Sequence, residues 1–185
     1  MKAIVKFGNS PDDLEFRDVS IPKLEYGKVL IQMKSTAICH TDISIINGKY
    51  KGRRPVPIPM IPGHEGAGIV VETYSDASMF RQGDRVAFEP LSGCRVCKNC
   101  LNGHFNLCTD WDHVGITCDG TFAEYITVPE SSLHKLPDEI TFESAAILEP
   151  TGLTVRSIEN VRPILGDTAA VVGPGAIGLL HVQAL

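Results

Sequence analysis

Four of the six cysteines in this 185-residue chain lie close together, at a spacing suited to binding one metal ion. They are Cys94, Cys97, Cys100 and Cys108. Zn²⁺ binds four thiolates tetrahedrally, and a site filled in this way leaves no position for water or substrate. The cluster therefore predicts a structural zinc ion that stabilises a lobe over residues 91–109.

The alternative for such a cluster is a set of disulfide bonds, which stabilise small secreted domains. Residues 1–20 carry charges throughout and lack the apolar segment of a secretion signal, which disfavours that alternative. A net charge of −5 argues against a nucleic-acid-binding surface. No apolar run reaches the ~18–20 residues of a membrane span. We therefore expect a cytoplasmic protein that binds neither nucleic acid nor a membrane.

Other residues of the types that bind catalytic zinc are spread along the sequence. Cys39 begins the segment Cys39-His40-Thr41-Asp42, while His64-Glu65 and Glu149 follow much later. A catalytic zinc ion takes three protein donors and keeps a fourth position for water or substrate. Each of these residues alone could be an ordinary core, loop or surface residue. The interpretation as a metal site depends on their occurring together with the four cysteines.

A glycine-rich motif, Gly173-Pro174-Gly175-Ala176-Ile177-Gly178, lies near the end of the sequence. It follows residues 168–172, which predict a buried strand, and precedes residues 179–185, which predict a helix. Glycines in this context let the backbone approach a pyrophosphate at the helix N-terminus. The motif therefore indicates dinucleotide binding, the alternative being a fortuitous glycine turn.

A complete dinucleotide-binding domain needs more than this motif. It requires further parallel strands, covering helices and an acidic residue ~20 residues beyond the glycines to contact the ribose. None of these follows within the 185 residues. We therefore expect the chain to be the N-terminal part of a longer protein, and to be inactive by itself.

Short strands dominate residues 1 to about 140, and these must position the candidate ligands. Alternating apolar and polar residues predict a strand at residues 29–34. Further strands are expected at residues 3–7, 67–72, 85–89 and 122–128. Many short strands between turns favour a small, β-barrel-like domain. Residues 141–160 predict helix, with Thr141 as an N-cap and Pro150 at a helix boundary or first turn.

Together these motifs resemble the N-terminal half of the zinc-containing medium-chain dehydrogenases, the family of alcohol, sorbitol and threonine dehydrogenases. The similar stretches run nearly from end to end: residues 39–42, 63–65, 83–86, 94–108, 119–125 and 173–178. The resemblance implies a mainly β fold, with a GroES-like β-barrel catalytic domain at residues 1–150 that includes the zinc lobe at 91–109. Residues 151–185 would form a linker helix and the first strand and helix of a truncated Rossmann α/β domain that binds NAD(P).

The resemblance also implies ligands for a catalytic zinc ion, the second of two per chain. Cys39 and His64 would bind it, and Glu65 and Glu149 compete for the remaining protein position. The polyol branch of the family is similar to this chain in having Glu followed by Pro at Glu149, which favours a polyol-like enzyme.

Further roles implied by the resemblance concern the proton and the cofactor. Thr41 would pass the substrate proton toward solvent, and Asp42 would accept a hydrogen bond from the second ring nitrogen of His64. Contacts to NAD or NADP would come from His40, Gly173, Gly175, Ala176, Ile177 and Gly178. The implied reaction transfers hydride between a small-molecule alcohol or polyol and the nicotinamide, in a full-length protein expected to be a homo-oligomer.

Two alternatives from other classes stay open. One is a zinc-stabilised binding module without catalysis, which would not use the dispersed ligands. The other is a zinc-free relative of the quinone reductases on the same fold, which the four cysteines and the Cys39/His64 pair disfavour. Two residues stand apart from the family pattern: Thr121 replaces a usual glycine, and Cys118 is interpreted as a small core residue.

Overall fold

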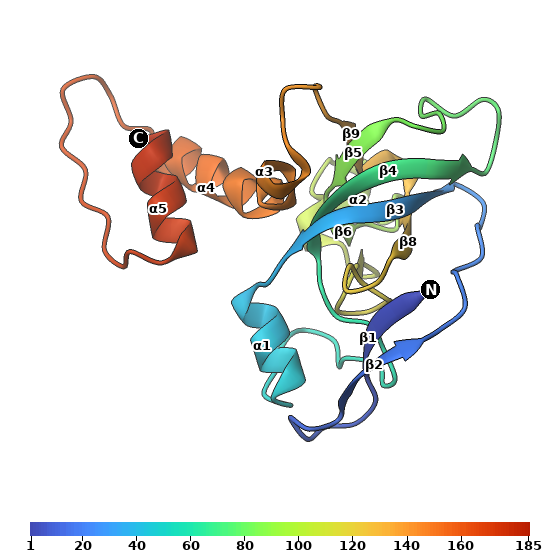
Figure 1. Ribbon diagram of the computed structural model, residues 1–185. Coiled ribbons are helices and arrows are strands. Elements are labelled where there is room, and N and C mark those ends of the chain that lie inside the picture. Colours follow the sequence, from blue (N-terminus) through green and yellow to red (C-terminus); the bar gives the residue numbers. More distant parts are fainter.

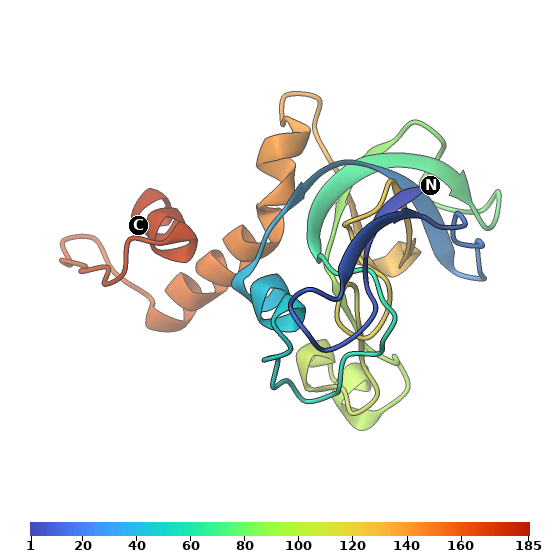
Figure 2. The ribbon, with the colours of Figure 1, turned by 60° about the horizontal axis from the view of Figure 1, so that its bottom comes forward.

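The computed structural model describes residues 1–185 as a strand-rich body and a helical arm that carries the C-terminus (Figure 1). A five-stranded antiparallel sheet in the order β8-β3-β4-β5-β9 forms most of the body. Its long strands curve around the interior (Figure 2). The strands are β3 (Lys28–Ala37), β4 (Glu65–Thr73), β5 (Arg85–Phe88), β8 (Tyr125–Pro129) and β9 (Leu133–Lys135).

An N-terminal hairpin of β1 (Lys2–Lys6) and β2 (Leu14–Asp18) packs against the body. It is joined there through backbone hydrogen bonds from Ile4 to the Phe122 carbonyl and from Lys6 to the Met60 carbonyl, each 2.8 Å long. The hairpin therefore fixes the two loops that precede β4 and β8.

The main core lies inside the curved sheet, where side chains from all five of its strands meet. Val29 and Ile31 of β3 are completely buried, while Lys34 on the same strand is exposed, in agreement with the predicted alternation. Burying each such side chain contributes about 1.5–3 kcal/mol. The core consists of Val29, Ile31, Val70, Phe80, Val86, Phe88, Val114, Ile126, Val128 and Leu133.

Between β5 and β8 the chain forms a small lobe that projects from the body, away from the helical arm (Figure 2). It contains β6 (Leu91–Ser92), helix α2 (Lys98–Leu101) and the 3-10 turn η1 (Phe105–Leu107). β6 pairs with β7 (Asp112–His113), which closes the base of the lobe. We call residues 91–109 the four-cysteine lobe.

Four α-helices outside the lobe connect these parts. α1 (His40–Ile46) follows β3, and α3 (Phe142–Ala146) and α4 (Leu148–Val161) lead out of the body into the arm. α5 (Ala176–Ala184) packs back against α4, with a hydrogen bond between Ser157 and His181 (Figure 1). None of the helices combines the length and apolar character that crossing a membrane requires.

The predicted helix at 141–160 is present, but Ile147 divides it into α3 and α4. Thr141 caps α3 as predicted, because its Oγ1 accepts a hydrogen bond from the Ser144 amide at 3.2 Å. Pro150 lies in the first turn of α4, where its missing N–H needs no intrahelical partner. The five strands predicted in residues 1–140 are confirmed as β1, β3, β4, β5 and β8, whereas β2, β6, β7 and β9 were not predicted.

The strand predicted at residues 168–172 does not form. These residues are exposed and pair with no other strand, although their apolar composition suits a buried strand. A strand is stabilised by hydrogen bonds to neighbours, and the described sheets offer this segment none. The helix predicted after the glycines does form, as α5.

Candidate active site and metal centre

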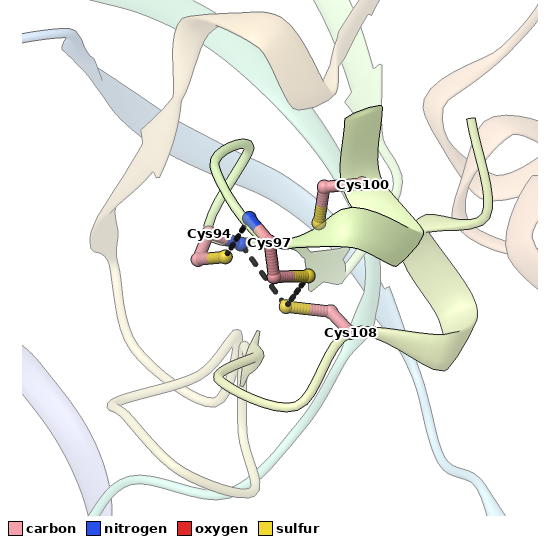
Figure 3. Close-up of side chains that lie close together, drawn as sticks. All are labelled: Cys94, Cys97, Cys100 and Cys108. Atoms are coloured by element: carbon pink, nitrogen blue, oxygen red, sulfur yellow. Dashed lines mark hydrogen bonds between the residues drawn. The ribbon is translucent and has the colours of Figure 1, made fainter. Parts of the chain in front are cut away.

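The four cysteines of the lobe converge on one point, with their sulfur atoms turned toward one another (Figure 3). All four ligand atoms lie within 4.8 Å of each other. Cys97 Sγ and Cys108 Sγ are 3.9 Å apart, close to the ~3.8 Å edge of a zinc tetrahedron with ~2.3 Å bonds. The structure contains no disulfide. The arrangement therefore fits a tetrathiolate metal site.

Backbone amides of the lobe point at the sulfur atoms. The Cys94 and Asp110 amides donate to Cys108 Sγ, and the Cys97 amide donates to Cys94 Sγ, each at 3.3 Å. An N–H group from Cys100, opposed by burial, lowers the pKa of Cys97 to about 6. Burial instead raises the pKa of Cys100 to about 12. The cluster alone therefore holds a mixture of thiol and thiolate, and a cation is needed for all four to ionise.

A second group of ligand atoms, from Cys39, His64 and Glu65, also falls within 4.8 Å. Cys39 is half-buried at the start of α1, whereas His64 and Glu65 are buried where the chain enters β4. The segments are far apart in sequence, and they meet because β3 and β4 pair with Ala37 opposite Glu65. We call these residues the Cys39–His64–Glu65 group.

Asp42 ties the two segments together. Its carboxylate is completely buried and accepts hydrogen bonds from the Cys39 amide at 2.9 Å and the Gly63 amide at 3.1 Å. The first bond completes a capping box at the N-terminus of α1. The predicted contact with His64 is present as a close approach, Nδ1 to Oδ1 at 3.2 Å, but the atoms are not aligned as a hydrogen bond.

The backbone before His64 can follow its path only with glycine. Gly63 has a φ of +94°, and a Cβ there would lie 2.3 Å from Thr121 Oγ1. Thr121 is buried, packs against Gly63, and shares a 2.5 Å hydrogen bond with Thr36. Thr121, which stands where the family usually has a glycine, therefore packs directly against the loop that carries His64.

The electrostatics of the group favour a bound cation or proton. Burial lowers the pKa of His64, but the close approach of the Asp42 carboxylate and the Cys39 side chain outweighs it and raises the pKa to about 10. The imidazole therefore holds a proton at neutral pH in the metal-free protein. Because a metal ligand must be deprotonated, metal binding has to displace this proton.

Glu149 lies outside the Cys39–His64–Glu65 group but close to it. It is half-buried in the first turn of α4. Burial raises its pKa, which the His64 charge lowers and the charges of Glu65 and Glu89 raise. Glu149 is thus within range of the charges of His64, Glu65 and Glu89, and of these three carboxylates only Glu65 belongs to the ligand group. Glu89 was not predicted from the sequence; its position directly after β5 is a weak signal.

The remaining sequence candidates differ in their surroundings. Thr41 is half-buried in the first turn of α1 beside Cys39, and His40 is exposed in the same turn. Cys118 is exposed, so its interpretation as a core residue was wrong. Its segment crosses from the turn at 115–118 to β8, and the side chain remains at the surface.

The glycine motif forms a tight turn into α5. Gly173 has a φ of +100°, and a Cβ on Gly178 would lie 1.9 Å from the Gly173 carbonyl oxygen. Gly175 is the N-cap of α5. The glycines, together with Ala176 and Ile177, are therefore at an exposed helix N-terminus, the geometry suited to phosphate.

One further residue near the site, His113, was also missed by the sequence analysis. Its ring lies edge-to-face against the His64 ring, with centroids 5.4 Å apart. Burial lowers the pKa of His113 to about 4, so this ring is neutral. His113 lies close to the turn at Gly115, and neither the periodicity nor the spacing of the sequence around it pointed to a functional site.

Comparisons with known proteins agree with this geometry. Residues 25–138 match the family model described as the alcohol dehydrogenase GroES-like domain. L-threonine 3-dehydrogenase of Francisella tularensis subsp. holarctica (strain OSU18) is 36% identical over 183 residues, which are 99% of this chain and 52% of that protein.

Two solved structures are similar over the whole chain. Galactitol-1-phosphate dehydrogenase from Escherichia coli has a TM-score of 0.89 at 28% identity, covering 100% of this chain and 52% of that one. A protein from Escherichia coli CFT073, named as a short chain alcohol dehydrogenase and solved with NADH, has a TM-score of 0.88 at 32% identity, covering 100% and 52%.

The chain spans about half the length of these relatives, 52% in each case. The family match covers more than half of the chain, and its residues 25–138 include the Cys39–His64–Glu65 group and the four-cysteine lobe. The chain therefore belongs to the medium-chain dehydrogenase family with an alcohol dehydrogenase GroES-like domain, and corresponds to the N-terminal portion of its members.

Proposed function

We propose that the full-length protein is a zinc-dependent, NAD(P)-linked alcohol or polyol dehydrogenase. Residues 1–150 would be its catalytic domain, with the zinc lobe at 91–109, and residues 151–185 the linker helix and start of the nucleotide-binding domain. The observation that carries the proposal is the convergence of the Cys39, His64 and Glu65 ligand atoms within 4.8 Å.

The donor set suits a catalytic rather than a structural metal. One thiolate, one imidazole and one carboxylate provide three donors, which leaves a position open, whereas the lobe provides four thiolates and is closed. A zinc ion in the open site would supply Lewis-acid polarisation of an alcohol oxygen. The reducing cytoplasm, where we place the protein, keeps the required thiols free.

The residues of the chain would hold this site and move the substrate proton. Asp42 holds Cys39 and the His64 loop in place through the Cys39 and Gly63 amides. Thr41, beside Cys39 on α1, has a hydroxyl that can accept a proton on one side and donate one on the other. We assign the third donor to Glu65, with Glu149 as an outer carboxylate able to approach the ion.

The substrate class and cofactor follow from the same site and the relatives. A relative of 36% identity is named for an amino-acid alcohol, and a structural neighbour for a polyol phosphate. The glycine turn at α5 supports NAD(P), and a structural neighbour was solved with NADH. We therefore propose a polyol-like secondary alcohol as the substrate.

Zinc content tests the proposal. Chain purified without chelator should contain two zinc ions, falling to one in Cys39→Ser and to one in Cys97→Ser, as measured by elemental analysis. Cys118→Ser is the matched control, since that thiol is exposed and belongs to neither cluster, and it should keep both ions. Zinc unchanged in Cys39→Ser would refute the catalytic site and leave a zinc-stabilised binding module. The full-length protein should oxidise polyols with NAD or NADP only with Cys39 intact.

A further inference from the structure

Three aromatic rings form a continuous row between the two ligand clusters. The Trp111 ring meets the His113 ring edge-to-face, with centroids 6.3 Å apart and an interplanar angle of 88°. His113 in turn meets His64 at 5.4 Å and 71°. Edge-to-face contacts at these separations are attractive and fix ring orientation. The row therefore reaches from Trp111 to a proposed ligand of the catalytic metal.

The other end of the row belongs to the four-cysteine lobe. Trp111 is 6% exposed and packs with Cys100 and Cys108 in one buried cluster. Arg53 and Arg54 lie over its ring, with guanidinium carbons 4.8 and 5.4 Å from the centroid. The Trp111 ring is thus held between two of the four cysteines and a pair of arginines from the loop before β4.

His113 is fixed at the base of the lobe. It lies in β7, two residues after Trp111, and pairs with Leu91 of β6, which comes three residues before Cys94, the first cysteine of the lobe. Its Nδ1 is 2.8 Å from the Val114 carbonyl oxygen, which can only accept, so Nδ1 carries the proton. Its amide donates to Thr117 Oγ1 at 2.8 Å. Ring and backbone therefore move with the lobe.

His64 needs such support. Ligand histidines are normally oriented by a hydrogen bond from the second ring nitrogen. Here the buried Nδ1 of His64 has no aligned hydrogen-bond partner, and Asp42 approaches it only to 3.2 Å. Packing against the His113 ring must then supply the orientation that a hydrogen bond supplies elsewhere.

We infer that Trp111 and His113 are positioning residues that hold His64 in its metal-binding orientation and make that orientation depend on the folded state of the four-cysteine lobe. The inference rests on the proposed role of His64 as a metal ligand. If so, the four-cysteine lobe not only stabilises the fold but also influences the metal affinity of the Cys39–His64–Glu65 group.

Cobalt binding to the 185-residue chain tests the positioning role without any enzymatic readout. Visible absorption that disappears in Cys39→Ser reports the Cys39–His64–Glu65 group. We expect His113→Ala to weaken Co²⁺ binding there by ~10-fold and His113→Phe, which keeps a ring, by less than ~3-fold. His134→Ala, at an exposed histidine of β9, should bind like the wild type.

The outcomes distinguish the positioning role of His113 from the proposed metal site on which it depends. If Cys39→Ser loses no cobalt absorption, the metal site itself is wrong. If Cys39→Ser loses the absorption and His113→Ala keeps wild-type affinity, the site stands and the positioning role is overturned. Equal losses in His113→Ala and His113→Phe would overturn the ring contact as the cause. Trp111→Phe gives a second, conservative variant should His113→Ala fail to fold.

A double-mutant cycle tests the dependence on the lobe. Cys97→Ser should weaken cobalt binding at the Cys39–His64–Glu65 group several-fold in the wild-type background. In the His113→Ala background the same substitution should have less than half of that effect on a logarithmic scale, since the connecting ring is gone. Additive losses would show that the two clusters are independent and would overturn the coupling.

Discussion

Replacing the buried carboxylate of Asp42 should loosen both ligand-bearing segments at once. Asp42→Ala removes the acceptor for the Cys39 and Gly63 amides and the carboxylate that lies 3.2 Å from His64 Nδ1. We expect the variant to lose both folding stability and zinc affinity, because one side chain holds the N-terminus of α1 and the loop that carries His64.

The expected magnitude follows from these contacts. A hydrogen bond to a charged group contributes ~1.5–3 kcal/mol, and two buried amide donors lose theirs. Alanine also removes the partner of a histidine whose pKa is raised to about 10, so that its proton becomes less stable in the folded state. Relaxation and entering water will recover part of this, and the net loss should be about 3–4 kcal/mol. Zinc affinity should fall ~10–100-fold.

Urea unfolding of the metal-free chain at pH 7, followed by circular dichroism, measures the first effect. Zinc competition with a chelating dye measures the second. Asp12→Ala, at an exposed carboxylate, is the control and should change stability by no more than ~0.5 kcal/mol. A loss below ~1 kcal/mol in Asp42→Ala, with an unchanged m-value, would refute the view that this carboxylate joins the two segments.

Three further predictions concern the metal and the cofactor. Zinc affinity at the Cys39–His64–Glu65 group should rise at least ~10-fold per pH unit from pH 6 to 8, because His64, with a pKa of about 10, must release a proton; a flat profile would contradict this. Glu65→Gln and Glu149→Gln should each weaken zinc binding, Glu65→Gln more strongly, and both much less than Cys39→Ser, as followed by dye competition. Should Glu149→Gln have no effect on affinity, the polyol-like assignment would lose its main support. The 185-residue chain should bind NAD and NADP no tighter than millimolar by calorimetry, because Gly173 and its neighbours are exposed and the segment before them is unpaired; micromolar binding would contradict this.

Local sequence patterns were sufficient for much of the fold and for the four-cysteine lobe. The alternation in residues 29–34 predicted β3, because Val29 and Ile31 on one face are buried while Lys34 on the other is exposed. The lobe was predictable because its four ligands lie within fifteen residues of one another. Both features depend on residues that are close together in the sequence, so a local sequence pattern is enough to predict them.

What the sequence did not predict depends on contacts between distant segments. His113 lies beside His64 only because β6 and β7 pair at the base of the lobe, and the charge of Glu89 acts on Glu149 only because the fold brings these two distant segments together. Our proposal of Glu65 rather than Glu149 as the third donor likewise rests on their positions in space. For residues 168–172 the local pattern predicted a strand that does not form, because no other strand pairs with this segment.

The helix α4 has one end at each of the two proposed binding sites. Its first turn carries Glu149 beside the metal ligands, and Ser157, eight residues later, is hydrogen-bonded to His181 of the helix that follows the glycine turn. These two residues are ~12 Å apart along a rigid rod. Because α4 is rigid and is hydrogen-bonded to α5, a tilt of α5 would also move the first turn of α4 and shift the Glu149 carboxylate.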